Sequence, residues 1–135
     1  MTMRRVGRPV ALLIAGVMLL GACGGSSTGV LDTVPALEAA SVLDSQPDAV
    51  LLDIRTPQEF AEGRIAGSAN IDFYAADFRS RLDALDRDTT YVVYCRSGNR
   101  SDSAMDIFAD LGFTSVYEVD GGIISWVNSG LPVGS

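Results

Sequence analysis

The sequence predicts an α/β fold built on a mostly parallel sheet with helices on both faces. Short, nearly all-apolar runs alternate along the chain with segments of helical periodicity, and such strands are typical of parallel sheets covered on both faces. The chain has 135 residues, of which 47% are hydrophobic, and this is enough for the core of one domain.

The predicted elements alternate along the chain. Strands are predicted over residues 49–54, 68–73, 90–95 and 115–119, and helices over residues 34–43, 56–63, 77–85, 101–111 and 122–130. The strands are short apolar runs such as AVLLDI and TYVVYC, and most of the helices carry apolar residues three or four positions apart. In the second helix, Thr56, Pro57 and Glu59 form the pattern of a capping box with proline at the first helical position.

Residues 1–22 are expected to be a lipoprotein signal peptide. An n-region with three arginines precedes an apolar run from Val10 to Ala22, which is shorter than the roughly 20 residues that span a bilayer. The run ends in LGAC, which resembles the bacterial lipobox, so Cys23 would carry the lipid and become the new N-terminus. We therefore expect an exported protein anchored to the outer face of the bacterial cytoplasmic membrane, in the cell envelope. An uncleaved N-terminal helix is the alternative.

Residues 23–32 are expected to be a flexible linker, because the stretch GGSSTG is rich in glycine and serine. The folded domain is then expected to cover residues 33–135. Cleavage before Cys23 would leave seven of the 10 arginines against 17 acidic residues, a net charge of −10, with Cys95 as the only free thiol.

The composition excludes several classes of function. A net charge of −7 argues against a nucleic-acid partner, because binding phosphate backbones requires a basic face. The absence of histidine removes the usual base of serine hydrolases and the commonest metal ligand, and two distant cysteines cannot form a structural zinc site. We therefore expect neither a metal nor an organic cofactor.

The segment CRSGNRS begins at Cys95, at the carboxyl end of a predicted strand, where open parallel sheets bind their ligands. Gly98 and Asn99 tolerate the backbone angles of a tight turn, so the loop amides are expected to converge on one point. Together with the N-terminus of the next helix, such amides bind an anion.

Positive charge surrounds this point as well, because the loop contains Arg96 and Arg100. The combined field should lower the pKa of Cys95 and keep it a thiolate at neutral pH without help from a histidine. A core cysteine beside an ordinary loop is the alternative interpretation, since free cysteine is among the most buried residue types.

Three segments follow one another in the chain: LLDIRTPQEFAEGRIAGSANI, YCRSGNRS and GGIISWVNSGLPV. They resemble the signature, the active loop and the closing motif of single-domain rhodaneses, which are thiosulfate and persulfide sulfurtransferases. The resemblance covers residues 33–133 and implies a rhodanese-like sheet of about five strands.

By this resemblance, Cys95 would take up sulfane sulfur as a persulfide from a donor such as thiosulfate. Cyanide, a small thiol or a partner protein would then accept the sulfur. The resemblance assigns the amides that hold the anionic sulfur to Arg96, Ser97, Gly98, Asn99 and Arg100. Arg100 would also steady the loop, and Ser101 would support it.

Asp53 and Arg55 lie at the end of another predicted strand and would face the same pocket by this resemblance. Arg55 could bind an anionic donor. Asp53 could fix the arginines or cap the following turn, and both roles stay open. Trp126 is expected to serve in packing.

One position departs from the family pattern, because Arg64 stands where rhodanese-like domains usually have histidine. We expect this change to affect local packing rather than chemistry. In the same segment, Glu59 is expected to be a helix cap and Phe60 a core ring.

Two other functions share these features. Cysteine phosphatases and arsenate reductases also combine a cysteine, an amide cradle and an arginine, but they place five residues between cysteine and arginine, where this chain has four. A persulfide carrier or binding module without turnover is the second alternative. Rhodanese-like domains that serve as binding modules usually lack the cysteine or have a degraded loop, whereas this chain keeps both.

Overall fold

The computed structural model describes residues 29–135, so the predicted signal peptide, the predicted lipidation site Cys23 and residues 23–28 lie outside the described residues. Five strands form one sheet in the order β1-β5-β4-β2-β3, and all neighbouring strands are parallel. The strands are β1 (Val30–Val34), β2 (Val50–Asp53), β3 (Ala69–Asn70), β4 (Thr90–Tyr94) and β5 (Ser115–Val119). The predicted parallel α/β fold is confirmed.

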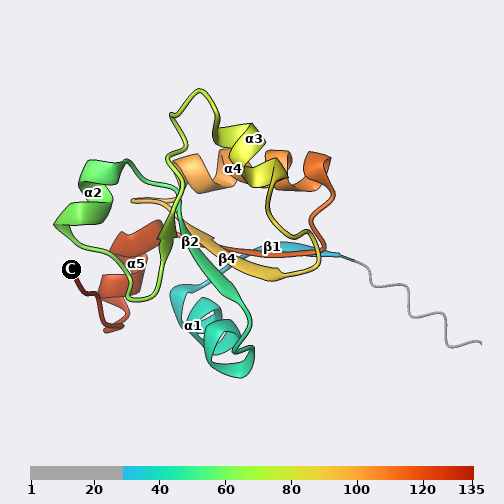
Figure 1. The fold of residues 1–135 in the computed structure, drawn as a ribbon. Coiled ribbons are helices and arrows are strands. Elements are labelled where there is room, and N and C mark those ends of the chain that lie inside the picture. Colours follow the sequence, from blue (N-terminus) through green and yellow to red (C-terminus); the bar gives the residue numbers. More distant parts are fainter. Residues whose placement is uncertain (1–28) are drawn as a thin grey trace, which may run out of the picture.

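Helices cover both faces of this sheet. They are α1 (Ala36–Ser45), α2 (Pro57–Glu62), α3 (Phe78–Asp83), α4 (Asn99–Leu111) and α5 (Gly122–Asn128). Figure 1 shows α3 and α4 on one face and α1 and α5 on the other. In residues 29–135, no helix combines the length and the apolar character that crossing a bilayer requires.

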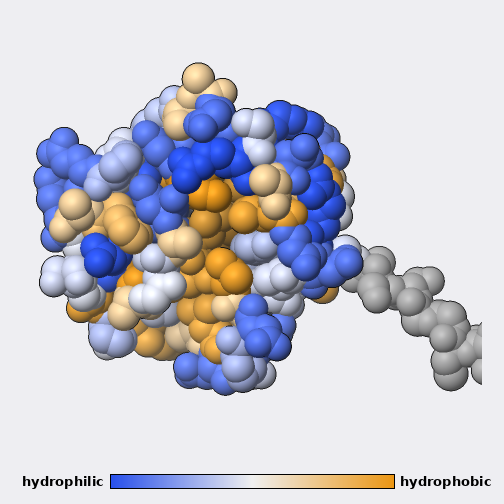
Figure 2. All heavy atoms as spheres, in the orientation of Figure 1, coloured by the Kyte–Doolittle hydropathy of each residue, from blue (hydrophilic) through white to orange (hydrophobic). Residues whose placement is uncertain are grey.

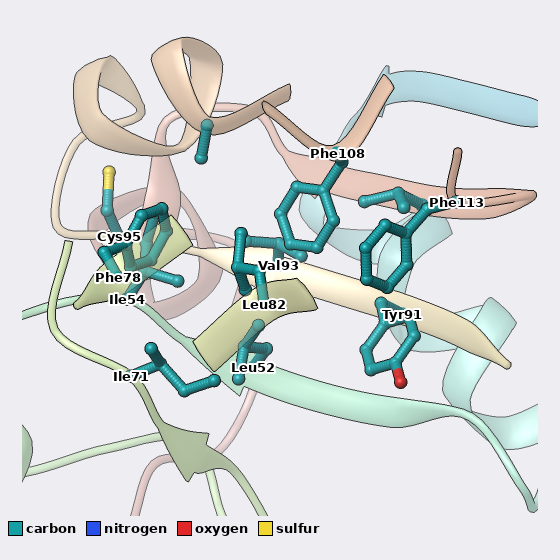
Figure 3. Packing of buried hydrophobic residues seen from close by; sticks show 12 residues of the cluster. Leu52, Ile54, Ile71, Phe78, Leu82, Tyr91, Val93, Cys95, Phe108 and Phe113 are labelled. Carbon is teal, nitrogen blue, oxygen red and sulfur yellow. The ribbon is translucent and has the colours of Figure 1, made fainter. Parts of the chain in front are cut away.

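The core is divided by the sheet into two clusters of buried residues. On the α3 and α4 side, Leu52 and Val93 of the strands pack against Leu82 and Phe108 of the helices. Figure 3 shows Cys95 at one end of this cluster, beside Phe78 and Ile54, whereas Tyr91, Phe108 and Phe113 gather at the other end. The second cluster, on the α1 and α5 side, includes Trp126, whose predicted packing role agrees with its burial.

The structure differs from the sequence-based expectation at β1. Residues 30–32, expected to belong to the flexible linker, form together with Thr33 and Val34 an edge strand that pairs with β5. The strand reads VLDTV, and only Val34 is buried. It therefore lacks the continuous apolar run that identified the other strands, and its pairing with a distant strand cannot be read from its own composition.

The opposite edge of the sheet is formed by β3, which has only two residues. Figure 2 shows hydrophobic residues in the middle of the visible surface, in front of β2, and hydrophilic residues above them, over α3 and α4. A strand this short offers few unpaired backbone groups, which is one way in which natural sheets avoid pairing with another chain.

Candidate active site

Cys95 lies directly after β4, and α4 begins four residues later at Asn99. The connecting turn needs Gly98, whose φ of 103° lies in the left-handed region that side chains disfavour. Residues Arg96, Ser97 and Asn99 are exposed on this loop, whereas Cys95 is only 1% exposed. The thiol is therefore at the bottom of the loop, beneath the turn.

Backbone amides surround the sulfur. The Gly98 amide donates a hydrogen bond to Cys95 Sγ over 3.1 Å. Burial is the largest influence on the thiol and raises its pKa, but the hydroxyl of Ser101 and the amides of Ser101, Gly98 and Arg100 outweigh it. The net result is a lowered pKa for Cys95, as expected for a thiol at the N-terminus of a 13-residue helix.

The start of α5 holds the carbonyl groups of the loop away from the sulfur. The Ile123 amide donates to the carbonyl oxygen of Cys95 over 2.9 Å, and the Ile124 amide donates to that of Arg96 over 3.2 Å. This contact needs Gly122, because a Cβ there would lie 2.5 Å from the Cys95 oxygen. These two carbonyls are thus bound by α5, while the amides of Gly98, Arg100 and Ser101 act on the sulfur.

Inside the loop, a chain of hydrogen bonds runs from the thiol into the core. Cys95 Sγ lies 3.4 Å from Ser101 Oγ, and the Ser101 hydroxyl lies 2.6 Å from Glu118 Oε1. The other carboxylate oxygen of Glu118 accepts a hydrogen bond from Thr33 over 2.7 Å. Glu118 is only 2% exposed. We call the four residues the inner network.

Outside the loop, Arg100 forms a two-pronged ion pair with Glu59 of α2. Its Nη1 and Nη2 atoms lie 2.8 and 2.9 Å from the two carboxylate oxygens. The hydrogen bond from Arg100 is the main cause that lowers the pKa of Glu59 to about 2. Glu59 also completes the predicted capping box with Thr56. It therefore has two roles, because it caps α2 and also holds the arginine of the loop.

Asp53 and Arg55 form a second ion pair at the end of β2. Arg55 Nη2 lies 2.6 Å from Asp53 Oδ2, and it also donates to the Gly63 carbonyl over 2.7 Å. Burial disfavours the charge of Arg55, but the hydrogen bonds and charge of Asp53 raise its pKa above the ordinary value. Asp53 thus fixes Arg55 but makes no hydrogen bond to Arg96 or Arg100 in the described structure.

Arg64, at the position that departs from the family pattern, packs locally. Its guanidinium lies 4.5 Å from the centre of the Phe60 ring and donates to the Phe60 carbonyl over 3.2 Å. Phe60, which was expected to be a core ring, is only half-buried. None of the residues of α2 is buried. Arg64 therefore covers a ring that the core does not reach.

A cleft of about 560 Å³ opens beside the loop. Its walls combine charged groups of Arg55, Glu59 and Arg96 with the apolar side chains of Ile123, Ile124 and Val127 on α5. In residues 29–135, the acidic and cysteine side chains form no group of three or more that could hold a metal ion. The cleft thus presents two arginines, two glutamates (Glu59 and Glu62) and an apolar surface next to the loop above Cys95.

Sequence reasoning missed two carboxylates of this site. The role of Glu59 toward Arg100 spans 41 residues and leaves no local signal beyond the capping box. Glu118 did leave a signal, because a glutamate in the apolar strand SVYEV has to find hydrogen-bond partners when the strand is buried. Nothing in the sequence indicated that these partners would be Ser101 and Thr33.

Comparison with known proteins places this geometry in a family. The family model for the rhodanese-like domain matches residues 36–129 of the chain. The thiosulfate sulfurtransferase GlpE of Pseudomonas aeruginosa is 47% identical over 79 residues, which cover 58% of this chain and 69% of that protein. A sulfurtransferase of Allochromatium vinosum is 37% identical over 86 residues, which cover 64% of this chain and 78% of that protein.

Solved structures give the same result. The crystal structure of a rhodanese-related protein from Thermoplasma volcanium is 38% identical and superposes with a TM-score of 0.62, covering 71% of this chain and 93% of that chain. A rhodanese-like domain protein from Staphylococcus aureus, 23% identical with a TM-score of 0.64, shares the fold over 77% of this chain and 99% of that chain. The family match over most of the described residues decides the assignment, and the chain belongs to the rhodanese family.

Proposed function

We propose that the protein is a sulfurtransferase that moves sulfane sulfur from a donor such as thiosulfate to a thiophilic acceptor through a persulfide on Cys95. The observation that carries the proposal is the sulfur of Cys95 beneath inward-facing amides, with its pKa lowered. The names of the sulfurtransferases to which the chain is similar support the same reaction class.

In the first step, the Cys95 thiolate attacks the outer sulfur of the donor. A sulfur–sulfur bond forms at Cys95, the bond inside the donor breaks, and sulfite leaves with the bonding electron pair when the donor is thiosulfate. The amides of Gly98, Arg100 and Ser101 are placed to stabilise the anionic persulfide.

In the second step, cyanide or a thiolate attacks the outer sulfur of the persulfide. The sulfur–sulfur bond at Cys95 breaks, the electron pair returns to Cys95, and thiocyanate or a new persulfide leaves. Arg96, exposed on the cleft wall, is placed to attract anionic substrates, whereas most of the hydrogen-bonding capacity of Arg55 is used by Asp53 and Gly63.

A thiosulfate:cyanide assay with wild type and Cys95→Ser tests this proposal. We expect wild type to form thiocyanate and to gain the mass of one sulfur atom when it is treated with thiosulfate alone, and Cys95→Ser to do neither. Wild type that forms no thiocyanate and never gains the sulfur would refute the proposal.

The exposed apolar side chains beside the loop favour a second candidate, a persulfide carrier that gives its sulfur to one protein partner without efficient turnover. Ile124 and Val127 on the cleft wall are 45% and 49% exposed, and an apolar surface of this kind suits contact with another protein. A carrier would gain one sulfur from thiosulfate but turn over slowly with cyanide and small thiols. The comparison of single-turnover loading with steady-state rate distinguishes the two functions.

We also propose that a lipid on Cys23 anchors the protein to the outer face of the bacterial cytoplasmic membrane. The proposal rests on the basic, apolar and LGAC segments of residues 1–23. We expect Cys23→Ala to move the protein from the membrane fraction to the soluble fraction of the cell envelope. Retention of the variant on membranes would show that the lipobox interpretation is wrong.

A further inference from the structure

The inner network contains a buried carboxylate that the proposed reaction does not yet use. Glu118 is 2% exposed, and its recorded hydrogen bonds are to the hydroxyl groups of Thr33 and Ser101. A buried carboxylate without a cation partner is costly when it is ionised. The Ser101 hydroxyl alone separates the carboxylate of Glu118 from the thiol of Cys95, which points to a role for Glu118 in the chemistry of the thiol.

The protons of the network are limited. The Ser101 hydroxyl has one proton, but Cys95 Sγ, the Gly98 carbonyl and Glu118 Oε1 all lie within hydrogen-bonding distance of its oxygen. When Ser101 donates to the carboxylate over the shortest of these distances, its lone pairs are free to accept the proton of the Cys95 thiol. When Glu118 holds a proton and donates it to Ser101, the Ser101 hydroxyl can donate to a Cys95 thiolate.

From this geometry we propose that Glu118 is a positioning residue that stores the proton of the Cys95 thiol, which reaches it through Ser101. The S–H bond of Cys95 breaks and its proton goes to Ser101 Oγ, while the proton of Ser101 passes to Glu118 Oε1. The electron pair stays on sulfur. One negative charge moves from the carboxylate to the sulfur, so the total charge of the buried network is unchanged.

This proposal deepens the proposed function, on which its catalytic relevance rests, and it explains how a protein without histidine can form the thiolate. The charged and titratable groups around the inner network are consistent with this proton transfer. Cys95 faces it from the end of β4, and α4 contributes Arg100, whose charge acts on Cys95 but is paired with Glu59. From β1 the neutral Thr33 faces Glu118.

Infrared spectroscopy of the full chain at neutral pH tests the proposal. Exposed carboxyl groups are ionised at this pH. An infrared band of a protonated carboxyl group therefore comes from a buried carboxyl group that has kept its proton. We expect wild type to show this band, and both Glu118→Gln and Cys95→Ser to lose it. Loss in Cys95→Ser is decisive, because a merely structural Glu118 would not respond to the removal of the thiol.

Matched variants define the path of the proton. Ser101→Ala removes the bridging hydroxyl and should also abolish the band, whereas Thr33→Val leaves the bridge intact and should retain it. The ultraviolet absorbance of the thiolate, with Cys95→Ser as the reference, should fall in Glu118→Gln at neutral pH relative to wild type.

The proposal is overturned if wild type lacks the band, or if the band survives in Glu118→Gln or Cys95→Ser. Survival in Ser101→Ala would equally exclude the path through the hydroxyl. Because the wild-type spectrum is informative alone, a variant that fails to fold does not remove the test. Neither measurement uses a sulfur donor or acceptor, so its outcome is independent of the thiosulfate assay.

Discussion

The loop above Cys95 is held from two sides by carboxylates in opposite surroundings. On the outer side, Glu59 is partly exposed and forms an ion pair with Arg100. On the inner side, Glu118 is buried, and its side-chain partners within residues 29–135 are the neutral hydroxyls of Ser101 and Thr33. An ion pair fixes a charge in place, whereas hydroxyls can donate or accept, so the outer contact is suited to positioning and the inner one to moving a proton.

Gly122→Ala should disturb both sides at once and have the largest effect. The new Cβ would lie 2.5 Å from the Cys95 oxygen and 2.6 Å from the Arg96 carbonyl, at a φ of 60°. We expect a loss of about 3 kcal/mol in the free energy of unfolding and a fall of roughly 100-fold in sulfur transfer. Chemical denaturation and the thiosulfate:cyanide assay measure the two effects.

Gly112→Ala is the matched control for this substitution. Gly112 also has a left-handed φ, of 81°, but an added Cβ there has nothing within 4 Å. Its cost should be that of the backbone alone, about 1 kcal/mol. Equal effects of the two substitutions would mean that the close approach of α5 does not hold the loop.

Glu59→Gln should break the outer contact alone and have a smaller effect. We expect a loss of about 2 kcal/mol at neutral pH, because Arg100 loses its charge partner. Glu59 has a pKa lowered from 4.5 to about 2, so its contribution is fully present above pH 4.5 and is lost as the pH falls through 2. Wild type and variant should therefore converge in stability at acid pH in urea titrations.

The exposed Glu62 on the same helix provides the control, and Glu62→Gln should change stability by less than about 0.5 kcal/mol at any pH. A constant difference between wild type and Glu59→Gln across the acid range would contradict the ionic role of Glu59. It would leave the capping of α2 as the function of this residue.

Arg64→Ala should have a smaller effect than Gly122→Ala and Glu59→Gln. Arg64 contacts α2 through the Phe60 ring and makes no contribution to the ion pair with Arg100. Loss of the contact with the Phe60 ring should cost about 0.5–1 kcal/mol. Arg79→Ala, at an exposed arginine whose nearest carboxylate is 3.7 Å away, should cost less. Thermal unfolding compares them, and equal values would show that the cation–ring contact contributes nothing measurable.

These contacts also show what the sequence could and could not predict. The sheet was predictable because its central strands are apolar runs, and the loop was predictable because its glycine, arginines and cysteine are neighbours in the chain. β1 was not, since Asp32 and Thr33 interrupt its apolar pattern. Thr33 is 85 residues from the carboxylate it binds, and Glu59 is 41 residues from Arg100. Such pairs become visible only when the fold brings them together.

The antiparallel bridge that joins Arg64 to Gly134 has a practical consequence. It ties the last residues of the domain to the segment after α2, and the neighbouring Val133 forms part of the cleft wall. A purification tag or fusion partner attached after Ser135 would therefore emerge next to the opening through which substrates approach. Kinetic work on this domain should use material with an unmodified C-terminal end.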